Sequence, residues 1–254
     1  MQRIPLHILL MGETGSGKDT FAATFPKPML VWHLDGYGQE MPYMKKAQHV
    51  GEIQNYVMGN SSINYRDIIA ADGGPVRIEY FSSDNPIQPM VSQVLESRMA
   101  NFTTEQHQWK TLVCGSLSSA ALESRLYEQF ILNAHFKDPR KWYGAATEYV
   151  ERLIMLQKAV VCNVIFICHV GRSMDEVGGE MLFTPDLPGR LSWSAGRYFN
   201  EMYRLYIMRS AETGVASRAL QTDGDGRYQA KTHIDAPNPV YPHYESLWSE
   251  WDKQ

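Results

Sequence analysis

The stretch Met11–Thr20, MGETGSGKDT, constrains the fold of this chain more than any other. It holds the pattern G-x-x-x-x-G-K between an apolar run and a segment of helical character. In this pattern glycines let backbone N–H groups turn inward around the α- and β-phosphates of a nucleotide, and the lysine reaches the β- and γ-phosphates. The sequence therefore predicts a phosphate-binding loop; the alternative is a Gly-rich turn without a ligand. The residues expected to contact a nucleotide are Gly12, Glu13, Thr14, Gly15, Ser16, Gly17, Lys18, Asp19 and Thr20.

Asp19 departs from the pattern, which places Ser or Thr after the lysine as a neutral ligand of Mg²⁺. A carboxylate reaches the same ion and is the kind of hard oxygen ligand that Mg²⁺ prefers. It also adds a negative charge beside the phosphates, so we expect nucleotide affinity to depend more strongly on Mg²⁺ than in loops with a hydroxyl here. Thr20 still offers its hydroxyl to the α-phosphate.

A second departure concerns the strand that supplies a carboxylate to such metal sites. Phosphate-binding loops of this kind are paired with an apolar strand ending in Asp, which helps to hold Mg²⁺. The matching run, TLVCGSLSSA, has Gly115 where the Asp is expected, followed by Ser116. Two interpretations stay open. Either Asp19 replaces the missing carboxylate and the metal site survives, or the site has decayed and the protein binds nucleotide without hydrolysing it.

The composition limits the class of protein. The chain has 254 residues, 44% of them hydrophobic, which fits one domain over 1–254 with a core at about 1–209 and a C-terminal hairpin and tail at about 210–254. Its net charge of −4 argues against nucleic-acid binding through overall charge, so any such contact comes from local loops. The three cysteines lie in apolar runs and are expected to be buried thiols of a reducing compartment. No run reaches the ~18 apolar residues of a membrane span, so we expect a cytoplasmic protein without a membrane partner.

Strand and helix patterns alternate along the chain, which predicts a mostly parallel sheet. Residues 50–70 are expected to be helix and loop. Two late strands, joined by a turn at DGDG, are expected to add antiparallel pairing near the C-terminus. Strands are expected at 3–11, 27–35, 75–83, 110–120, 162–170, 200–210 and 228–235, and helices at 18–25, after Pro89 and at 147–160.

These segments together resemble the phage-type nucleotide-binding ATPases with a RecA core. The resemblance covers roughly Ile4–Pro239, and PDLPGRLSWSAGRYFNEMYRL is its more family-specific stretch. It implies an α/β fold with a RecA-like P-loop NTPase core, a mostly parallel sheet flanked by helices, and ATP with Mg²⁺ as cofactors. It further implies a homo-oligomer, a ring or filament with ATP between subunits, that acts on single-stranded DNA in recombination or annealing. A phage-encoded member works in the host cytoplasm.

The resemblance also implies roles for residues outside the loop. Asp35 ends the second strand, where relatives place an acidic residue that activates the attacking water; its alternative is a turn former, and Glu40 is a second candidate for the role. His169 ends the NVIFICHV strand, where relatives place a polar sensor of the γ-phosphate; its alternative is a solvent-exposed histidine. Lys231 lies in a segment that caps the neighbouring subunit's ATP in relatives, and its alternative is an exposed lysine on an edge strand.

The segment HFKDPRKWYG is the candidate DNA surface. Lys137, Arg140 and Lys141 outweigh Asp138 there, and aromatic residues are interleaved with them. Cations with aromatic side chains are typical of grooves that bind single-stranded nucleic acid. The alternative is a solvated loop whose aromatic side chains pack on the rest of the protein.

Three functions compete on these observations. The first is an ATP-binding RecA-core protein that acts on single-stranded DNA, with hydrolysis retained, slow or lost. The second is a phosphotransferase like the nucleoside-monophosphate kinases, which need an Arg-rich lid for which Arg190 and Arg197 are the candidates. The third is a nucleotide-dependent assembly protein without turnover, which the missing carboxylate at Gly115 favours. Whether ATP is hydrolysed stays open.

Overall fold

The structure is a computed structural model that describes residues 3–35, 40–58, 61–81, 91–104, 107–135, 137–174, 179–210 and 213–249. Its strands are β1 (His7–Gly12), β2 (Met29–His33), β3 (His49–Val50), β4 (Gln54–Met58), β5 (Ser61–Ile69), β6 (Pro75–Tyr80), β7 (Thr111–Gly115), β8 (Asn163–Cys168), β9 (Val170–Met174), β10 (Met181–Pro185), β11 (Glu201–Arg209) and β12 (Ala216–Gln221). Its helices are α1 (Lys18–Ala22), α2 (Met41–Met44), α3 (Val91–Thr104), α4 (Leu117–Tyr127), α5 (Pro139–Leu156), α6 (Leu191–Ser194) and α7 (Tyr244–Leu247). A π-helical turn, η1 (Glu128–Leu132), follows α4, and 3-10 turns occur at η2 (Gln157–Ala159) and η3 (Ala195–Tyr198).

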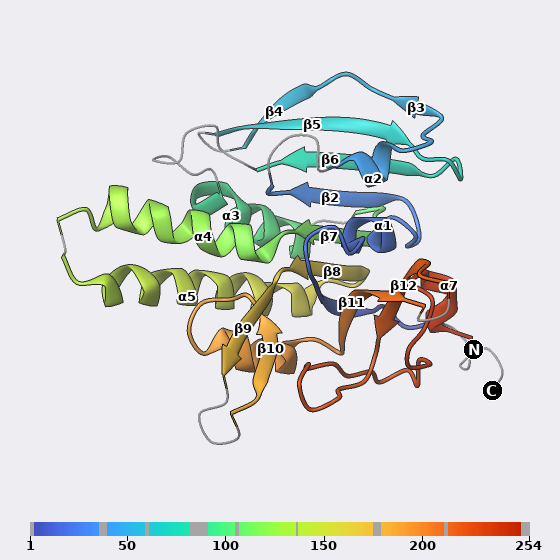
Figure 1. Cartoon of the computed structure of the whole chain (residues 1–254). Helices are drawn as coiled ribbons and strands as arrows, with labels where there is room; N and C mark the ends of the chain where they lie inside the picture. Colours follow the sequence, from blue (N-terminus) through green and yellow to red (C-terminus); the bar gives the residue numbers. More distant parts are fainter. Residues whose placement is uncertain are drawn as a thin grey trace.

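One large sheet runs through the centre of the described structure (Figure 1). Its order is β12-β11-β1-β8-β7-β2-β6-β5-β3, with β4 paired to β5. From β11 to β6 every neighbouring pair is parallel, and β12 and β5 add antiparallel pairs at the two sides. The central strands are almost wholly buried, as expected for parallel strands covered on both faces. The predicted fold class, a mostly parallel sheet with antiparallel strands near the C-terminus, is confirmed.

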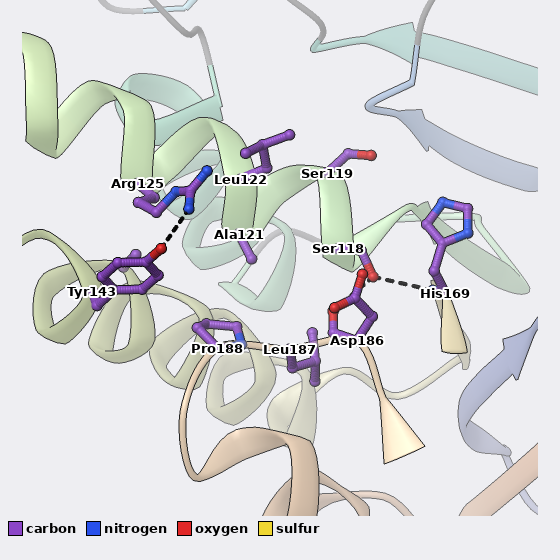
Figure 2. Close-up of a pocket in the computed structure, with 11 residues that line it drawn as sticks. Ser118, Ser119, Ala121, Leu122, Arg125, Tyr143, His169, Asp186, Leu187 and Pro188 are labelled. Atoms are coloured by element: carbon purple, nitrogen blue, oxygen red, sulfur yellow. Dashed lines mark hydrogen bonds between the residues drawn. The ribbon is translucent and has the colours of Figure 1, made fainter. Parts of the chain in front are cut away.

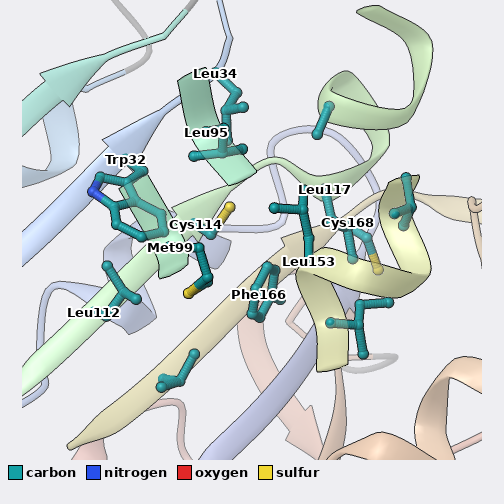
Figure 3. Packing of buried hydrophobic residues seen from close by; sticks show 14 of the residues in the cluster. Trp32, Leu34, Leu95, Met99, Leu112, Cys114, Leu117, Leu153, Phe166 and Cys168 are labelled. Atoms are coloured by element: carbon teal, nitrogen blue, oxygen red, sulfur yellow. The ribbon is translucent and has the colours of Figure 1, made fainter. Parts of the chain in front are cut away.

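Helices cover both faces of the sheet because successive strand residues point to opposite sides. In β1, Leu9 and Met11 join a cluster with side chains of α3, α4 and α5, part of which Figure 3 shows. Ile8 and Leu10 join the opposite cluster, which includes side chains of α1, α2 and α7. The three cysteines are buried free thiols. This double cover holds β1, β7 and β8 in a rigid frame, and the ends of these strands carry the site.

The expectation of helix and loop at 50–70 is wrong, because this segment forms β4 and β5 and the end of β3. The C-terminal two thirds of β5 pair with β6, from Asn64 opposite Tyr80 to Ile69 opposite Pro75. Tertiary pairing with a strand already in the sheet overrides the weak local preference of this segment.

The late strands are also partly different from those expected. β11 is present, but its antiparallel partner is β12, not residues 228–235, which contribute only isolated bridges at Tyr228 and Lys231. The expected helix at 147–160 begins earlier, at Pro139, where the side chain of Asp138 accepts a hydrogen bond from the backbone N–H of Arg140 and caps the helix. The residues from Pro139 to Gly144, expected in a loop, therefore lie in α5.

Candidate nucleotide-binding site

The Gly-rich loop joins β1 to α1 in a conformation that depends on its glycines. Gly17 has a φ of 102°, in the left-handed region that favours glycine. Gly12 packs so closely against β11 that a Cβ there would lie 2.6 Å from the carbonyl oxygen of Leu205. The loop is closed by a hydrogen bond of 3.1 Å from the N–H of Ser16 to the carbonyl of Glu13. The conformation of the loop is thus fixed by close backbone packing and by a hydrogen bond within the loop.

Lys18 lies folded over this loop and is buried. Its Nζ donates to the carbonyl oxygens of Gly12 at 2.9 Å and Glu13 at 3.1 Å. Burial lowers the pKa of the ammonium group, and the nearby carboxylates, of which Asp19 is the strongest, oppose that shift. A desolvated cation of this kind gains from a strong anionic partner.

A pocket of about 250 Å³ opens beside the loop at the carboxyl ends of the central strands. Ligands in open α/β sheets bind at this edge. The pocket brings together most of the residues that the sequence singled out. Its described lining consists of Thr14, Gly15, Gly17, Lys18, Asp19, Thr20, Asp35, Pro42, Ser116, Ile167, His169 and Arg218.

The side chain of Asp19 lies beside the position where the strand β7 lacks a carboxylate. A Cβ placed on Gly115 would be 3.6 Å from Oδ1 of Asp19. The hydroxyl of the buried Tyr43 donates to the same oxygen at 3.2 Å and holds the carboxylate there. Burial raises the pKa of Asp19, and the hydrogen bond from Tyr43 opposes this. The two departures seen in the sequence therefore meet at one point in space.

Asp35 lies at the end of β2 and is tied to the start of α4. The hydroxyl of Ser119 donates to its Oδ1, and the hydroxyl of Ser116 lies 3.5 Å from the same oxygen. The hydroxyl of Ser116 also caps α4 by accepting from the N–H of Ser119 at 3.1 Å. Of the two acidic candidates, Asp35 lines the pocket, whereas Glu40 is buried with its Oε2 3.7 Å from Nε2 of His33.

His169 follows β8 and lines both this pocket and an adjoining groove of about 420 Å³ between α4, α5 and the segment after β10. Its backbone N–H donates to the hydroxyl of Ser118 at 3.1 Å. Figure 2 shows His169 at one end of the groove, and Arg125 and Tyr143 at the other, joined by a hydrogen bond of 2.8 Å from Nη1 to Oη. The groove and the loop pocket are therefore neighbours that share the residue His169.

Some predicted residues lie elsewhere. Glu13 is exposed and its Oε1 is 3.2 Å from Nη2 of Arg172 on β9. The Ser16 hydroxyl is buried beneath the loop. Lys231 bridges to Met202 near the start of β11, away from the pocket of its own chain.

The three basic residues of the candidate DNA surface are exposed at the beginning of α5. Arg140 is held by the carboxylate of Asp138, with contacts of 2.7–3.0 Å, so part of its charge is neutralised locally. Lys137 precedes the helix and Lys141 lies in its first turn.

Sequence reasoning missed Tyr43, Ser119 and Arg218. A local sequence signal for Ser119 was present, since Ser116 and Ser119 have the spacing of a helix N-cap and the residue whose N–H it accepts from. Tyr43 and Arg218 had none, because each reaches the loop from a segment distant in sequence.

Within the described ranges, no group of three or more His, Cys, Asp or Glu side chains gathers as a metal site. Mg²⁺ bound with a nucleotide needs only one or two carboxylates, because phosphate oxygens and water complete its shell. None of the described helices has the length and apolar character needed to cross a membrane.

A Gly-rich loop between the first strand of a mostly parallel sheet and a helix, with a buried lysine at its end, defines the class of P-loop nucleotide-binding proteins. Residues 4–234 match the family described as AAA domain, and the chain belongs to that family. P-loop proteins generally bind nucleotide together with Mg²⁺.

Among solved structures, the chain is similar to the KaiC-like protein from the hyperthermophilic archaeon Pyrococcus horikoshii OT3. The two are 16% identical with a TM-score of 0.41, and the match covers 85% of this chain and 77% of that chain. No curated protein matches the chain.

Proposed function

We propose that the protein binds ATP with Mg²⁺ in the loop pocket and acts on single-stranded DNA in phage-type recombination or annealing. The observation that carries nucleotide binding is the position of Lys18, which is buried at the end of the Gly-rich loop with its Nζ hydrogen-bonded to two backbone carbonyls. An ammonium group in this position exchanges weak carbonyl partners for charged phosphate oxygens when a nucleotide binds.

The pocket contains side chains suited to each part of Mg-ATP. Lys18 serves the β- and γ-phosphates, Asp19 the Mg²⁺, and His169 the γ-phosphate. Asp35, oriented by two serine hydroxyls, is the candidate for positioning a water molecule. Bound Mg-ATP supplies the phosphoanhydride and a divalent charge that neutralises the carboxylate of Asp19 beside the phosphates.

The groove next to the pocket supports a nucleic-acid partner. It combines an aromatic ring, Tyr143, with the guanidinium of Arg125, whose Cζ lies 5.2 Å from the ring centroid. Stacking surfaces beside cations suit single-stranded nucleic acid. Arg140 lies one helical turn before Tyr143 on α5, so the basic segment leads to the groove. The shared residue His169 gives a physical route by which the nucleotide and the strand influence each other.

The proposed assembly is a ring or filament in which Lys231 contacts the ATP of a neighbouring subunit. Its position outside the pocket of its own chain supports a role in trans over one in cis. The oligomeric state, measured by light scattering with and without Mg-ATP, tests this part of the proposal.

One alternative function has specific support. The absence of a strand carboxylate at Gly115 favours an assembly protein that binds nucleotide without hydrolysing it. The kinase alternative is weakened, since Nη2 of Arg190 lies 2.6 Å and that of Arg197 3.8 Å from the carboxylate of Glu151 on α5, so neither is poised as a lid over the pocket.

An ATPase assay with and without single-stranded DNA separates these functions. The proposed function predicts binding of Mg-ATP and slow hydrolysis that single-stranded DNA accelerates. Binding without turnover in either condition supports the assembly protein. Phosphate transfer to a nucleoside monophosphate supports the kinase, and the absence of any Mg-ATP binding contradicts all three.

Replacing Lys137, Arg140 and Lys141 together with Ala is expected to weaken binding of single-stranded DNA. Each lost phosphate contact removes roughly 0.7 from the slope of log affinity against log salt, so the triple variant should lose about 2 units of slope. Fluorescence anisotropy with a labelled oligonucleotide over a salt series measures both quantities.

The matched control removes the same charge from exposed lysines elsewhere, Lys45, Lys110 and Lys158. This control should bind the oligonucleotide with an affinity and slope close to those of the parent. If the triple variant of Lys137, Arg140 and Lys141 also retains the parent's affinity and slope, these three residues do not form the DNA surface.

A further inference from the structure

Arg218 on β12 lies against the Gly-rich loop, although 202 positions separate it from the loop residue it contacts. Its Nε donates to the carbonyl oxygen of Ser16 at 2.9 Å. It also packs on Gly17, where an added Cβ would lie 2.8 Å from Nε and 3.0 Å from Cδ. Arg218 thus lines the pocket. In the strand order its strand, β12, lies on one side of β1, and β8 and β7 lie on the other.

The guanidinium of Arg218 retains most of its donor capacity in this position. Arginine has five N–H donors in a fixed fork, and among the described residues only the donor on Nε has a hydrogen-bond acceptor. No carboxylate lies within ion-pair distance of Arg218 in the described part of the chain. The hydrogen bond to the loop backbone fixes Nε of the guanidinium and leaves the two terminal nitrogens, Nη1 and Nη2, as donors for an anion.

The order of the sheet determines which end of a nucleotide faces Arg218. The acidic end of the pocket lies on one side of β1. It consists of Asp35, which follows β2, and Asp19, which lies beside Gly115 at the end of β7. Arg218, on β12, lies on the other side. Because Mg²⁺ bridges the β- and γ-phosphates, those phosphates belong at the acidic end and Lys18 lies between. The α-phosphate and the nucleoside then extend toward β12.

We propose that Arg218 binds the α-phosphate of the nucleotide held by its own subunit. This inference rests on the proposed nucleotide binding and adds a residue and a direction to it. The α-phosphate is common to ATP and ADP, so Arg218 strengthens the binding of both by the same factor. It differs in this from Asp19, whose contribution depends on Mg²⁺.

The test is calorimetric titration of the full chain and its Arg218→Gln variant with ADP, ATP and inorganic tripolyphosphate, each with Mg²⁺. Charge-assisted hydrogen bonds predict a loss of roughly 10- to 100-fold in affinity. The loss should be equal for ADP and ATP, and also appear for tripolyphosphate, whose third phosphate takes the α-position. Arg218→Lys should recover part of the loss, because it keeps the charge without the fork.

Arg209→Gln is the matched control, since Arg209 is an exposed arginine on the neighbouring strand of the same hairpin and does not line the pocket. It should bind all three ligands as the parent does, and thermal unfolding should show that each variant is folded. Unchanged ADP affinity in Arg218→Gln overturns the inference, as does a loss for ATP alone, which would place Arg218 at the γ-phosphate. A loss for both nucleotides but not for tripolyphosphate overturns it in favour of a contact with the base.

These outcomes are distinct from failure of the proposed function. If the parent protein binds neither nucleotide, the loop pocket itself is not a nucleotide site and both proposals fall. If the parent binds and Arg218→Gln binds equally well, only the role of Arg218 is overturned. Should Arg218→Gln not fold, the titrations of Arg218→Lys replace it. ADP affinity equal to that of the parent then overturns the inference, and an equal loss for ADP and ATP supports it.

Discussion

Lys18→Ala is expected to abolish binding of Mg-ATP while leaving the fold intact. The lysine is the ammonium group of the Gly-rich loop, and the phosphates lose their direct charged donor without it. Charge-assisted hydrogen bonds of this kind predict a loss of more than about 100-fold in affinity. Calorimetric titration with Mg-ATP measures it, and circular dichroism with thermal unfolding checks the fold.

Lys18→Met is the companion variant, because it keeps an unbranched side chain of similar length in the buried position and removes only the charge. Both variants should fail to bind. An affinity equal to that of the parent in either one would rule out the phosphate-binding loop as the nucleotide site, since no second lysine lines the described pocket.

Asp19→Asn is expected to weaken binding of Mg-ATP strongly and to affect metal-free ATP less, or even to improve its binding. The carboxylate lies where a side chain from Gly115 would point, so we propose that it takes the place of the missing strand carboxylate at the metal. Its removal takes away a ligand of Mg²⁺ and, without metal, a repulsive charge beside the phosphates. ATP affinity across a magnesium titration measures both effects.

Moving the carboxylate back to the strand extends this experiment. Asp19→Thr with Gly115→Asp should keep Mg-ATP binding and raise hydrolysis, because it restores the hydroxyl and the strand carboxylate of other P-loop proteins. Asp19→Thr alone removes the carboxylate without replacing it and should lose the magnesium dependence. Gly115→Asp alone should bind poorly, since a Cβ added at 115 would lie 3.6 Å from Oδ1 of Asp19 and two carboxylates would repel each other there.

Tyr43→Phe serves as the control for these variants, because it deletes the hydrogen bond to Asp19 and keeps the carboxylate. It should preserve the magnesium dependence with a modest loss of affinity. If Asp19→Asn leaves the magnesium dependence as it is in the parent, Asp19 is no metal ligand and the interpretation of a decayed site is the better one.

The phosphate-binding loop and the central strands could be predicted from the sequence because their signals are local. Gly12 is required because the backbone of β11 packs closely against it, and Gly17 is required because its φ is positive. Apolar runs of β-branched residues became buried parallel strands, and the cysteines in them became buried thiols. The paired departure at Asp19 and Gly115 was also visible in the sequence, since both positions belong to known motifs.

Pairing between segments distant in the sequence could not be predicted from local sequence patterns. The segment 50–70 carries no strong strand signal and becomes β4 and β5 only because β6 offers an edge to pair with. The same holds for β12, which pairs with β11 although its local pattern predicts neither strand nor helix. Nothing in the local sequence around Arg218 distinguishes it from other exposed arginines.

The sequence by itself determined that this chain has a phosphate-binding loop on a mostly parallel sheet, because a strand, a Gly-rich turn and a helix are specified by short-range backbone preferences. Only the tertiary structure decided what surrounds that loop. Tyr43, Ser119 and Arg218 reach the site because the order of the strands places their segments at one edge of the sheet. That order is set by which faces and edges can be buried together, a property of the whole chain and of no single segment.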